Sequence, residues 1–276
     1  MAVATDTVER IVLAALAEDI GSGDVTTDAT VSIDAVGVAD LLVKEAGVVC
    51  GVRVAETTFR ALDPDIRFEA IASDGDFVEP PALVARISGS ERAILTGERV
   101  ALNFVGRLSG VATLTRCYVT AVEGTGTAVL DTRKTTPGLR ALEKHAVAAG
   151  GGRNHRFGLD DAVLVKDNHL RAAGSVMDAV RLVRAASDLP IEVECETLTQ
   201  VAEALEAGVD AILLDNMTLA ELREAVALTA GRVRLEASGG VSLDTIRAIA
   251  ETGVDEISVG ALTHSARSLD VSLELT

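Results

Sequence analysis

The sequence predicts an α/β protein: an N-terminal α+β sandwich domain followed by an incomplete parallel α/β barrel of about six strands. In residues 125–264, apolar runs rich in β-branched residues alternate regularly with helical patterns. Glu194, Asp215 and Glu236 end three successive runs at a constant spacing of 21 residues, which suits minimal strand–helix units. In residues 1–110, by contrast, short strands come before a helix without strict alternation, which is typical of an α+β domain.

The first domain is expected to span residues 1–110. Its elements are predicted by amphipathic spacing at both ends and by short alternating runs between them. The expected segments are a helix over Thr7–Ala17, strands within Ala35–Lys44, Arg67–Ile71 and Leu83–Ser88, and a helix from Ser90 to about Ser109.

The second domain is expected to span residues 111–265. Its runs are nearly continuous in apolar residues, which indicates a parallel sheet buried on both faces. Equal spacing favours a barrel over an open sheet, but a full eightfold barrel needs about 250 residues, so the barrel should be incomplete. The runs are Thr127–Asp131, Ala162–Lys166, Ile191–Glu194, Ala211–Asp215, Val233–Glu236 and Glu256–Gly260.

Charged residues end five of these runs. Because the carboxyl ends of barrel strands meet at one opening, where reactive residues lie, we expect these side chains to converge there. They are Asp131, Lys166, Glu194, Asp215 and Glu236.

Composition narrows the function classes. No apolar stretch approaches the ~18 residues that span a bilayer, and no basic leader precedes the first helix, so we expect a soluble cytoplasmic protein. Three distant cysteines, Cys50, Cys117 and Cys195, predict neither a disulfide framework nor a zinc site. One Tyr, no Trp and a net charge of −17 argue against nucleic-acid binding.

Charge is unevenly distributed along the chain. Residues 131–171 hold eight basic and five acidic residues, whereas the remainder holds 17 basic and 37 acidic ones. Anionic ligands are therefore expected at this one segment. The acid excess, together with only four lysines, also suggests a salt-adapted (halophilic) surface; codon bias toward Arg is the alternative.

Two motifs in the basic segment are suited to anions. Asp131–Arg140 leaves a strand and enters a helix, placing Arg133 and Lys134 beside threonine hydroxyls near a helix N-terminus. The glycine-rich loop Gly150–Arg156 carries Arg153, His155 and Arg156, and its glycines permit close approach of a ligand. An exposed helix cap and a mobile surface loop are the structural alternatives.

Later strand ends suggest a metal and a phosphate site. Glu194 and Asp215 end consecutive strands, where they could bind Mg²⁺ with substrate oxygens or form ion pairs with Lys134 and Lys166. The small-residue turns Ala237–Val241 and Val259–His264 follow the last strands, where barrels commonly bind phosphate through backbone amides.

These motifs resemble the quinolinate phosphoribosyltransferase family over nearly the whole chain. The resemblance implies a homodimer and an N-terminal sandwich that the C-terminal tail, residues 266–276, rejoins. Its motifs are Glu18–Thr26, Gly97–Phe104, Ser109–Thr113, Asp131–Leu139, Gly150–Gly158, Lys166–His169, Leu214–Met217, Glu236–Gly240 and Ser258–Ser265.

The resemblance also implies a reaction and its residues. Quinolinate and phosphoribosyl pyrophosphate would give nicotinate mononucleotide, pyrophosphate and CO₂, with Mg²⁺ as cofactor, in NAD biosynthesis. Catalytic roles would fall to Lys134, Lys166, Glu194 and Asp215, the last two also holding Mg²⁺. Substrate would be bound by Arg133, His155, Arg156, Ser238, Gly239, Gly240, Val259, Gly260 and Ala261, and by Arg99 from the neighbouring subunit.

Three other functions remain open from the sequence. A molybdate-operon paralogue of the same family, with an unknown acceptor or only a binding role, shares some motifs, although Lys166–His169 favours the quinolinate enzyme. A Schiff-base aldolase could use Lys166 at its strand end. A non-catalytic anion-binding scaffold would bind the same ligands without turnover.

Overall fold

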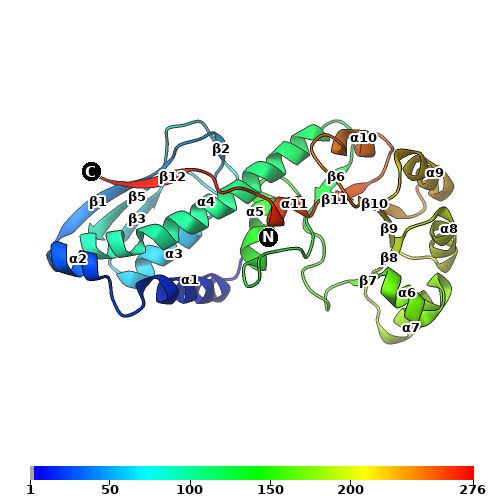
Figure 1. Cartoon of the computed structure of the whole chain (residues 1–276), viewed down its shortest axis with the longest axis horizontal. Coiled ribbons are helices and arrows are strands. Elements are labelled where there is room, and N and C mark those ends of the chain that lie inside the picture. Colours follow the sequence, from blue (N-terminus) through cyan, green and yellow to red (C-terminus); the bar gives the residue numbers. More distant parts are fainter. Residues whose placement is uncertain (1–2) are drawn as a thin grey trace. The chain divides into compact units, whose positions relative to one another are not determined.

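The computed structural model describes residues 3–276, which divide into two compact units. The first unit contains residues 1–116, 135–151 and 262–276, and the second contains residues 117–134 and 152–261 (Figure 1). None of the helices in the described part of the chain is long and apolar enough to cross a membrane.

The first unit is built on a four-stranded antiparallel sheet of order β12-β1-β5-β3. Its strands are β1 (Val36–Val43), β3 (Arg67–Ala70), β5 (Ala82–Ser90) and β12 (Val271–Leu275), and the short strands β2 (Gly47–Val48) and β4 (Phe77–Val78) pair separately. The C-terminal tail thus returns to this unit, where Leu273 of β12 pairs with Leu41 of β1. The expected N-terminal strands are present at nearly the predicted positions.

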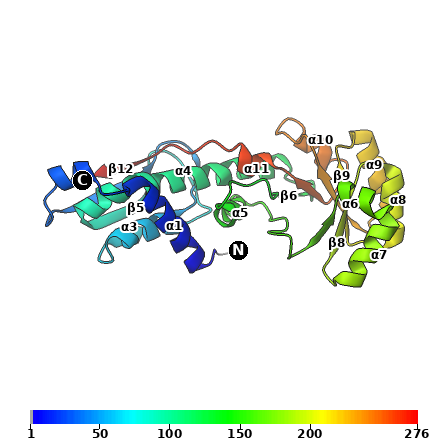
Figure 2. The same cartoon turned by 60° about the horizontal axis from the view of Figure 1, so that its bottom comes forward.

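Five helices accompany this sheet: α1 (Thr5–Ile20), α2 (Val25–Thr30), α3 (Val52–Leu62), α4 (Glu91–Ala121) and α5 (Arg140–Ala149). Helices α3 and α4 pack against the sheet because their apolar residues recur every three or four positions (Figure 2). Phe59 of α3 and Ile94 of α4 are fully buried with Leu41 and Ile87 in one hydrophobic core.

Two elements differ from the sequence expectation in extent or place. Helix α4 runs to Ala121, beyond the expected domain boundary at residue 110. Helix α5 belongs to the first unit, although chain order placed it in the barrel domain. The boundary between the units therefore passes through α4, through the loops on both sides of α5, and after the first residue of α11 (Ala261–His264).

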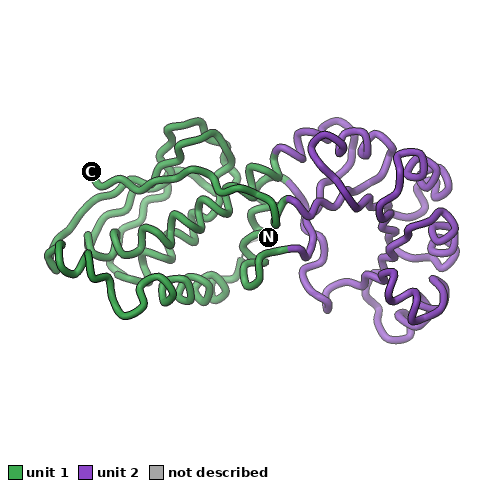
Figure 3. Tube along the Cα trace, viewed as in Figure 1, with its two compact units in different colours: residues 1–116, 135–151, 262–276 green, residues 117–134, 152–261 purple. Residues whose placement is uncertain are grey.

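The second unit, drawn in purple in Figure 3, contains six parallel strands, and their order in the sheet is β6-β11-β10-β9-β8-β7. Among the described residues no ladder joins β6 to β7, so the sheet curves without closing, and the expected incomplete α/β barrel is confirmed. The strands are β6 (Ala128–Leu130), β7 (Val163–Val165), β8 (Ile191–Cys195), β9 (Ala211–Asp215), β10 (Arg234–Ser238) and β11 (Glu256–Ser258).

Helices follow most of these strands after short turns. They are α6 (Asp167–Ala173), α7 (Val176–Ala186), α8 (Leu198–Ala207), α9 (Leu219–Thr229), α10 (Ile246–Ala250) and the short α11 (Ala261–His264). Helix α8 begins with a capping box between Thr197 and Gln200, and α9 begins with one between Thr218 and Glu221. These capping boxes determine where the helices after β8 and β9 begin.

Candidate active site

The carboxyl ends of β7 to β10 surround one cavity of about 430 Å³ in the second unit. Lys166 follows β7, Glu194 lies at the end of β8, and Asp215 is the last residue of β9. The other predicted residues that line the cavity are Arg133, Lys134, His155, Arg156, Ser238, Gly239 and Gly240. Ten of the predicted site residues thus share one space, in keeping with parallel strand ends meeting at one opening.

One side of the cavity is strongly basic. Arg133 and Lys134 belong to the loop after β6, and Arg156 to the glycine-rich loop. Burial, followed by the charge of Arg133, lowers the pKa of Arg156. The Nε of Arg156 is buried without a hydrogen-bond partner in the described structure, while its Nη1 donates to the carbonyl of Ala162 at 3.1 Å. A partly buried guanidinium beside a second one is suited to bind an anionic ligand.

The two predicted metal-binding carboxylates line the same cavity. Glu194 Oε2 lies 3.3 Å from Lys166 Nζ, so one of the ion pairs left open by the sequence is formed. Asp215 Oδ2 accepts a hydrogen bond from the Asn216 side chain at 2.7 Å. Both carboxylates line the cavity from adjacent strands, and carboxylate oxygens are ligands that Mg²⁺ prefers. The donor set therefore fits Mg²⁺.

His155 also lines the cavity and contacts two buried carboxylates. Its Nε2 is 2.9 Å from Glu192 Oε2 and 3.3 Å from Glu236 Oε2. Burial alone would lower the pKa of His155, but these carboxylates outweigh it and raise the pKa to about 10. Burial also raises the pKa of Glu236.

The second ring nitrogen of His155 also has a partner. His155 Nδ1 lies 2.8 Å from the backbone nitrogen of Arg156. Both ring nitrogens are therefore engaged within the protein. A direct contact between His155 and a substrate carboxylate stays a prediction.

The turn after β10 provides a small-residue surface beside Asp215. Gly239 and Gly240 have φ angles of +98° and +60°, and the Ser238 carbonyl accepts a hydrogen bond from the Asn216 N–H at 2.9 Å. A Cβ on Gly239 would lie 2.1 Å from Asn216 Oδ1, so only glycine fits. Asn216 itself adopts a left-handed conformation, with φ of 55°.

Several predicted residues do not line this cavity. Arg99 belongs to α4 of the first unit, and its side chain is 64% exposed. The Val259 N–H donates to the Leu130 carbonyl at 2.9 Å, so this amide is used within the fold; Gly260 and Ala261 follow it. Asp131 is fully buried and accepts the His155 N–H at 2.9 Å. It therefore shapes the glycine-rich loop instead of facing the opening.

Other lining residues were not assigned a role from the sequence: Thr132, Leu164, Leu213, Asn216 and Ser258. The sequence could have indicated a role for Asn216. It follows a strand-ending Asp, and asparagine is among the few residues that tolerate a left-handed backbone conformation, as a tight turn at this point requires. Glu192 was also noticeable in the sequence, as a charge between the apolar residues Ile191 and Val193 of β8.

Comparison with known proteins identifies the family. The model of the quinolinate phosphoribosyl transferase C-terminal domain matches residues 111–274, and that of the N-terminal domain matches residues 24–109. The chain belongs to the quinolinate phosphoribosyltransferase family. The resemblance predicted from the motifs is thereby confirmed.

Individual relatives match over almost their full length. The probable nicotinate-nucleotide pyrophosphorylase [carboxylating] of Bacillus subtilis is 43% identical over 261 residues, covering 94% of this chain and 90% of the relative. The protein of the same name from Synechocystis is 46% identical over 265 residues, with the same coverage. The crystal structure of NadC from Streptococcus pyogenes superposes with a TM-score of 0.96 at 44% identity, covering 100% of this chain and 99% of that one.

Proposed function

We propose that this protein transfers the phosphoribosyl group of phosphoribosyl pyrophosphate to quinolinate in NAD biosynthesis. The products are nicotinate mononucleotide, pyrophosphate and CO₂. The observation that carries this proposal is that Arg133 and Arg156 line the same cavity as the strand-end carboxylates Glu194 and Asp215. A dicarboxylic acid and a sugar with hydroxyl and phosphate groups need these two kinds of surface side by side.

The basic side of the cavity is assigned to quinolinate. Arg133 and Arg156 bind its two carboxylates, because a guanidinium matches a carboxylate with two parallel hydrogen bonds. Lys134 and Lys166 line the same space and serve both anions. Lys166 pairs with Glu194 and is 47% exposed, unlike the desolvated lysines that form Schiff bases, which disfavours the aldolase alternative.

The carboxylates Glu194 and Asp215 and the turn after β10 are assigned to phosphoribosyl pyrophosphate. Glu194 and Asp215 hold the ribose hydroxyls and would hold Mg²⁺, which when bound neutralises charge on the pyrophosphate. The Ser238 hydroxyl and the backbone N–H groups of Gly239 and Gly240 bind the 5′-phosphate.

The chemistry requires mainly positioning and charge stabilisation. The pyridine nitrogen attacks C1 of the ribose as the bond to pyrophosphate breaks, and Lys134 and Lys166 stabilise the leaving group. The ring nitrogen becomes positively charged when it is ribosylated. The electron pair left when the adjacent carboxylate departs as CO₂ is stabilised by that charge and then takes up a proton.

The first experiment measures the reaction and the contribution of Arg133 to quinolinate binding. The protein is incubated with both substrates and Mg²⁺, and CO₂ and the mononucleotide are quantified. Replacing Arg133 with Ala should raise the KM for quinolinate about 30-fold, since a lost charge-assisted contact costs about 2 kcal/mol.

Arg171→Ala is the matched control, because this arginine belongs to the same basic segment but its side chain is 78% exposed on α6. It should leave the KM unchanged. Absence of both products with the unmodified protein would refute the proposed function, whereas an unchanged KM in a folded Arg133→Ala variant would refute only the role of Arg133.

A homodimer in which Arg99 reaches the neighbouring subunit's site is the proposed assembly. It is tested by mixing two inactive variants, Arg99→Ala and Asp215→Asn. If Arg99 acts across subunits, half of the randomly re-formed dimers have one intact site, and activity should recover to about a quarter of that of the unmodified protein. If Arg99 acts within its own subunit, mixing restores nothing, and if it has no role, the Arg99→Ala variant is active by itself.

A further inference from the structure

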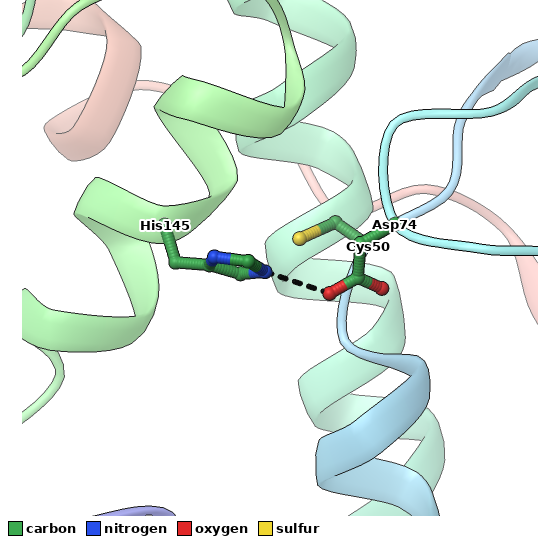
Figure 4. A group of neighbouring side chains, drawn as sticks. All are labelled: Cys50, Asp74 and His145. Atoms are coloured by element: carbon green, nitrogen blue, oxygen red, sulfur yellow. Dashed lines mark hydrogen bonds and ion pairs between the residues drawn. The ribbon is translucent and has the colours of Figure 1, made fainter. Parts of the chain in front are cut away.

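A second cluster of chemically capable side chains lies in the first unit and contains none of the residues of the proposed active site. Cys50 follows β2, Asp74 lies in the loop before β4, and His145 is on α5 (Figure 4). One ligand atom from each residue, the Sγ, a carboxylate oxygen and a ring nitrogen, lies within 4.8 Å of both others. Asp74 Oδ2 and His145 Nε2 are 2.8 Å apart.

The backbone around the cluster holds these side chains in place. Asp74 Oδ1 accepts hydrogen bonds from the Gly51 and Val52 N–H groups at 2.9 and 3.0 Å, which leaves Oδ2 directed toward His145. The Cys50 N–H donates to Ser109 Oγ at 2.9 Å, and the Ser109 hydroxyl donates back to the Cys50 carbonyl at 3.1 Å. Metal-binding carboxylates are oriented in this way by hydrogen bonds to their second oxygen.

Burial and access decide what kind of chemistry the cluster suits. Cys50 is fully buried, whereas the side chains of Asp74 and His145 are 20% and 27% exposed, so an ion can reach the cluster from their side. Burial, followed by the nearby Asp74 carboxylate, raises the pKa of Cys50 well above its ordinary value. An uncomplexed Cys50 is therefore a neutral thiol and a poor nucleophile.

We propose that Cys50, Asp74 and His145 form a binding site for Zn²⁺ or a similar thiophilic divalent cation, with water as the fourth ligand. Sulfur, nitrogen and carboxylate oxygen together are the donor set of zinc; Mg²⁺, which requires oxygen ligands, is excluded. A tetrahedral ion with bonds of about 2.0–2.3 Å holds its donor atoms roughly 3.2–3.7 Å apart. Because the three atoms lie within 4.8 Å of one another, binding would shorten the distances to the Cys50 sulfur by up to about 1 Å and open the Asp74–His145 pair by about 0.5 Å.

The site joins three segments that are distant in sequence. Cys50 lies one residue before the first turn of α3, Asp74 holds that turn through Gly51 and Val52, and His145 belongs to α5. A bound ion therefore links α5 to the start of α3. Because it binds the folded unit and not the unfolded chain, it should raise the midpoint of thermal unfolding.

The test uses Co²⁺ as a spectroscopic substitute for Zn²⁺. The full-length protein is freed of metal with a chelator and titrated with Co²⁺, and the thiolate-to-cobalt charge-transfer absorption is followed. The site predicts one such centre per chain, displaced by one equivalent of Zn²⁺, and a higher unfolding midpoint with Zn²⁺. The cavity proposed as the active site has no cysteine among its lining residues, so a metal ion there gives no thiolate band.

Substitutions identify the ligands. Cys50→Ser should abolish the band, and His145→Gln should weaken Zn²⁺ binding about a hundredfold or more, because even the loss of a supporting group around a zinc site costs ten- to a hundredfold. Cys117→Ser and Cys195→Ser are the matched controls and should keep the band, since one thiol is exposed and the other is buried elsewhere.

Circular dichroism establishes that each variant is folded. If the buried Cys50→Ser variant does not fold, His145→Gln still decides, because this side chain is partly exposed and glutamine can still donate to Asp74. No thiolate band in the unmodified protein, a band retained in folded Cys50→Ser, or unchanged Zn²⁺ affinity in His145→Gln would each overturn the proposal.

Discussion

Gly239 occupies a position where both backbone conformation and space exclude a side chain. Its φ of +98° is unfavourable for other residues, and a Cβ would lie 2.1 Å from Asn216 Oδ1. Gly239→Ala should therefore displace the turn that is proposed to bind the 5′-phosphate. We expect a loss of about 2 kcal/mol in stability from backbone strain, and a KM for phosphoribosyl pyrophosphate raised about tenfold.

Gly174→Ala is the control that separates the effect of backbone strain from the effect of a steric clash. Gly174 has a similar φ of +100°, but a Cβ added there would meet nothing within 4 Å. This variant should lose comparable stability in urea unfolding and keep the KM of the unmodified protein. An equal rise in KM for both variants would show that general destabilisation, and not the shape of the turn, controls substrate affinity.

At the same scale, strand-end residues could be predicted from the sequence, whereas their partners could not. Lys166, Glu194 and Asp215 each stand where an apolar run stops, and parallel geometry then requires them to meet. The contacts of His155 with Glu192 and Glu236 depend on which side chains point into the barrel, and this is set by register between strands distant in sequence. A motif shows that His155 is present; only the fold shows what its ring nitrogens contact.

Helix α5 is attached to the first unit by a buried carboxylate. Glu143 is fully buried, and it accepts hydrogen bonds from Arg107 at 2.7 Å and from the N–H and hydroxyl of Thr136 at 2.9 and 2.8 Å. Arg107 also donates to the carbonyls of Ala266 and Thr263. One acidic side chain therefore connects α4, α5 and the loop that precedes α5.

Removing this charge should be costly. Glu143→Gln leaves Arg107 partly buried beside a neutral amide, and breaking a buried ion pair typically costs about 3–5 kcal/mol. Glu251→Gln is the control: Glu251 pairs with Arg247 on the surface, where both side chains are about half exposed, and such pairs are worth about 1 kcal/mol or less. Urea unfolding of the two variants provides the comparison, and similar losses would contradict the central role of Glu143.

The bounds of helices and strands were predicted well where the local sequence pattern determines them. They were predicted less well where contacts with distant segments determine them. All six barrel strands lie within two residues of the expected positions, because continuous apolar runs determine them. Helix α4 was expected to end near Ser109, but it continues through Gly110, which local pattern would place at a helix end. Gly110 is instead required by packing. A Cβ at this position would lie 1.9 Å from the Arg267 carbonyl oxygen, so only glycine leaves room for the C-terminal tail.

The whole molecule carries far more negative than positive charge. Its 42 acidic and 25 basic side chains give a net charge of −17, while the cavity concentrates arginines and lysines that attract anionic substrates. Repulsion among the acidic groups opposes the folded state at low ionic strength, whereas the many exposed ion pairs contribute little, about 0–1 kcal/mol each. Net repulsion is therefore the larger electrostatic effect on stability.

Salt should consequently stabilise the protein. At 1 M salt the screening length falls to about 3 Å, which removes most repulsion between separated carboxylates. We expect the midpoint of thermal unfolding to rise by about 5 °C between 0.1 and 2 M KCl at pH 7. The isoelectric point is about 4.6, so the same salt step should have a smaller effect at pH 5.5, where fewer net charges remain. A midpoint that stays constant or falls with KCl at pH 7 would show that the acidic surface is not an adaptation to salt.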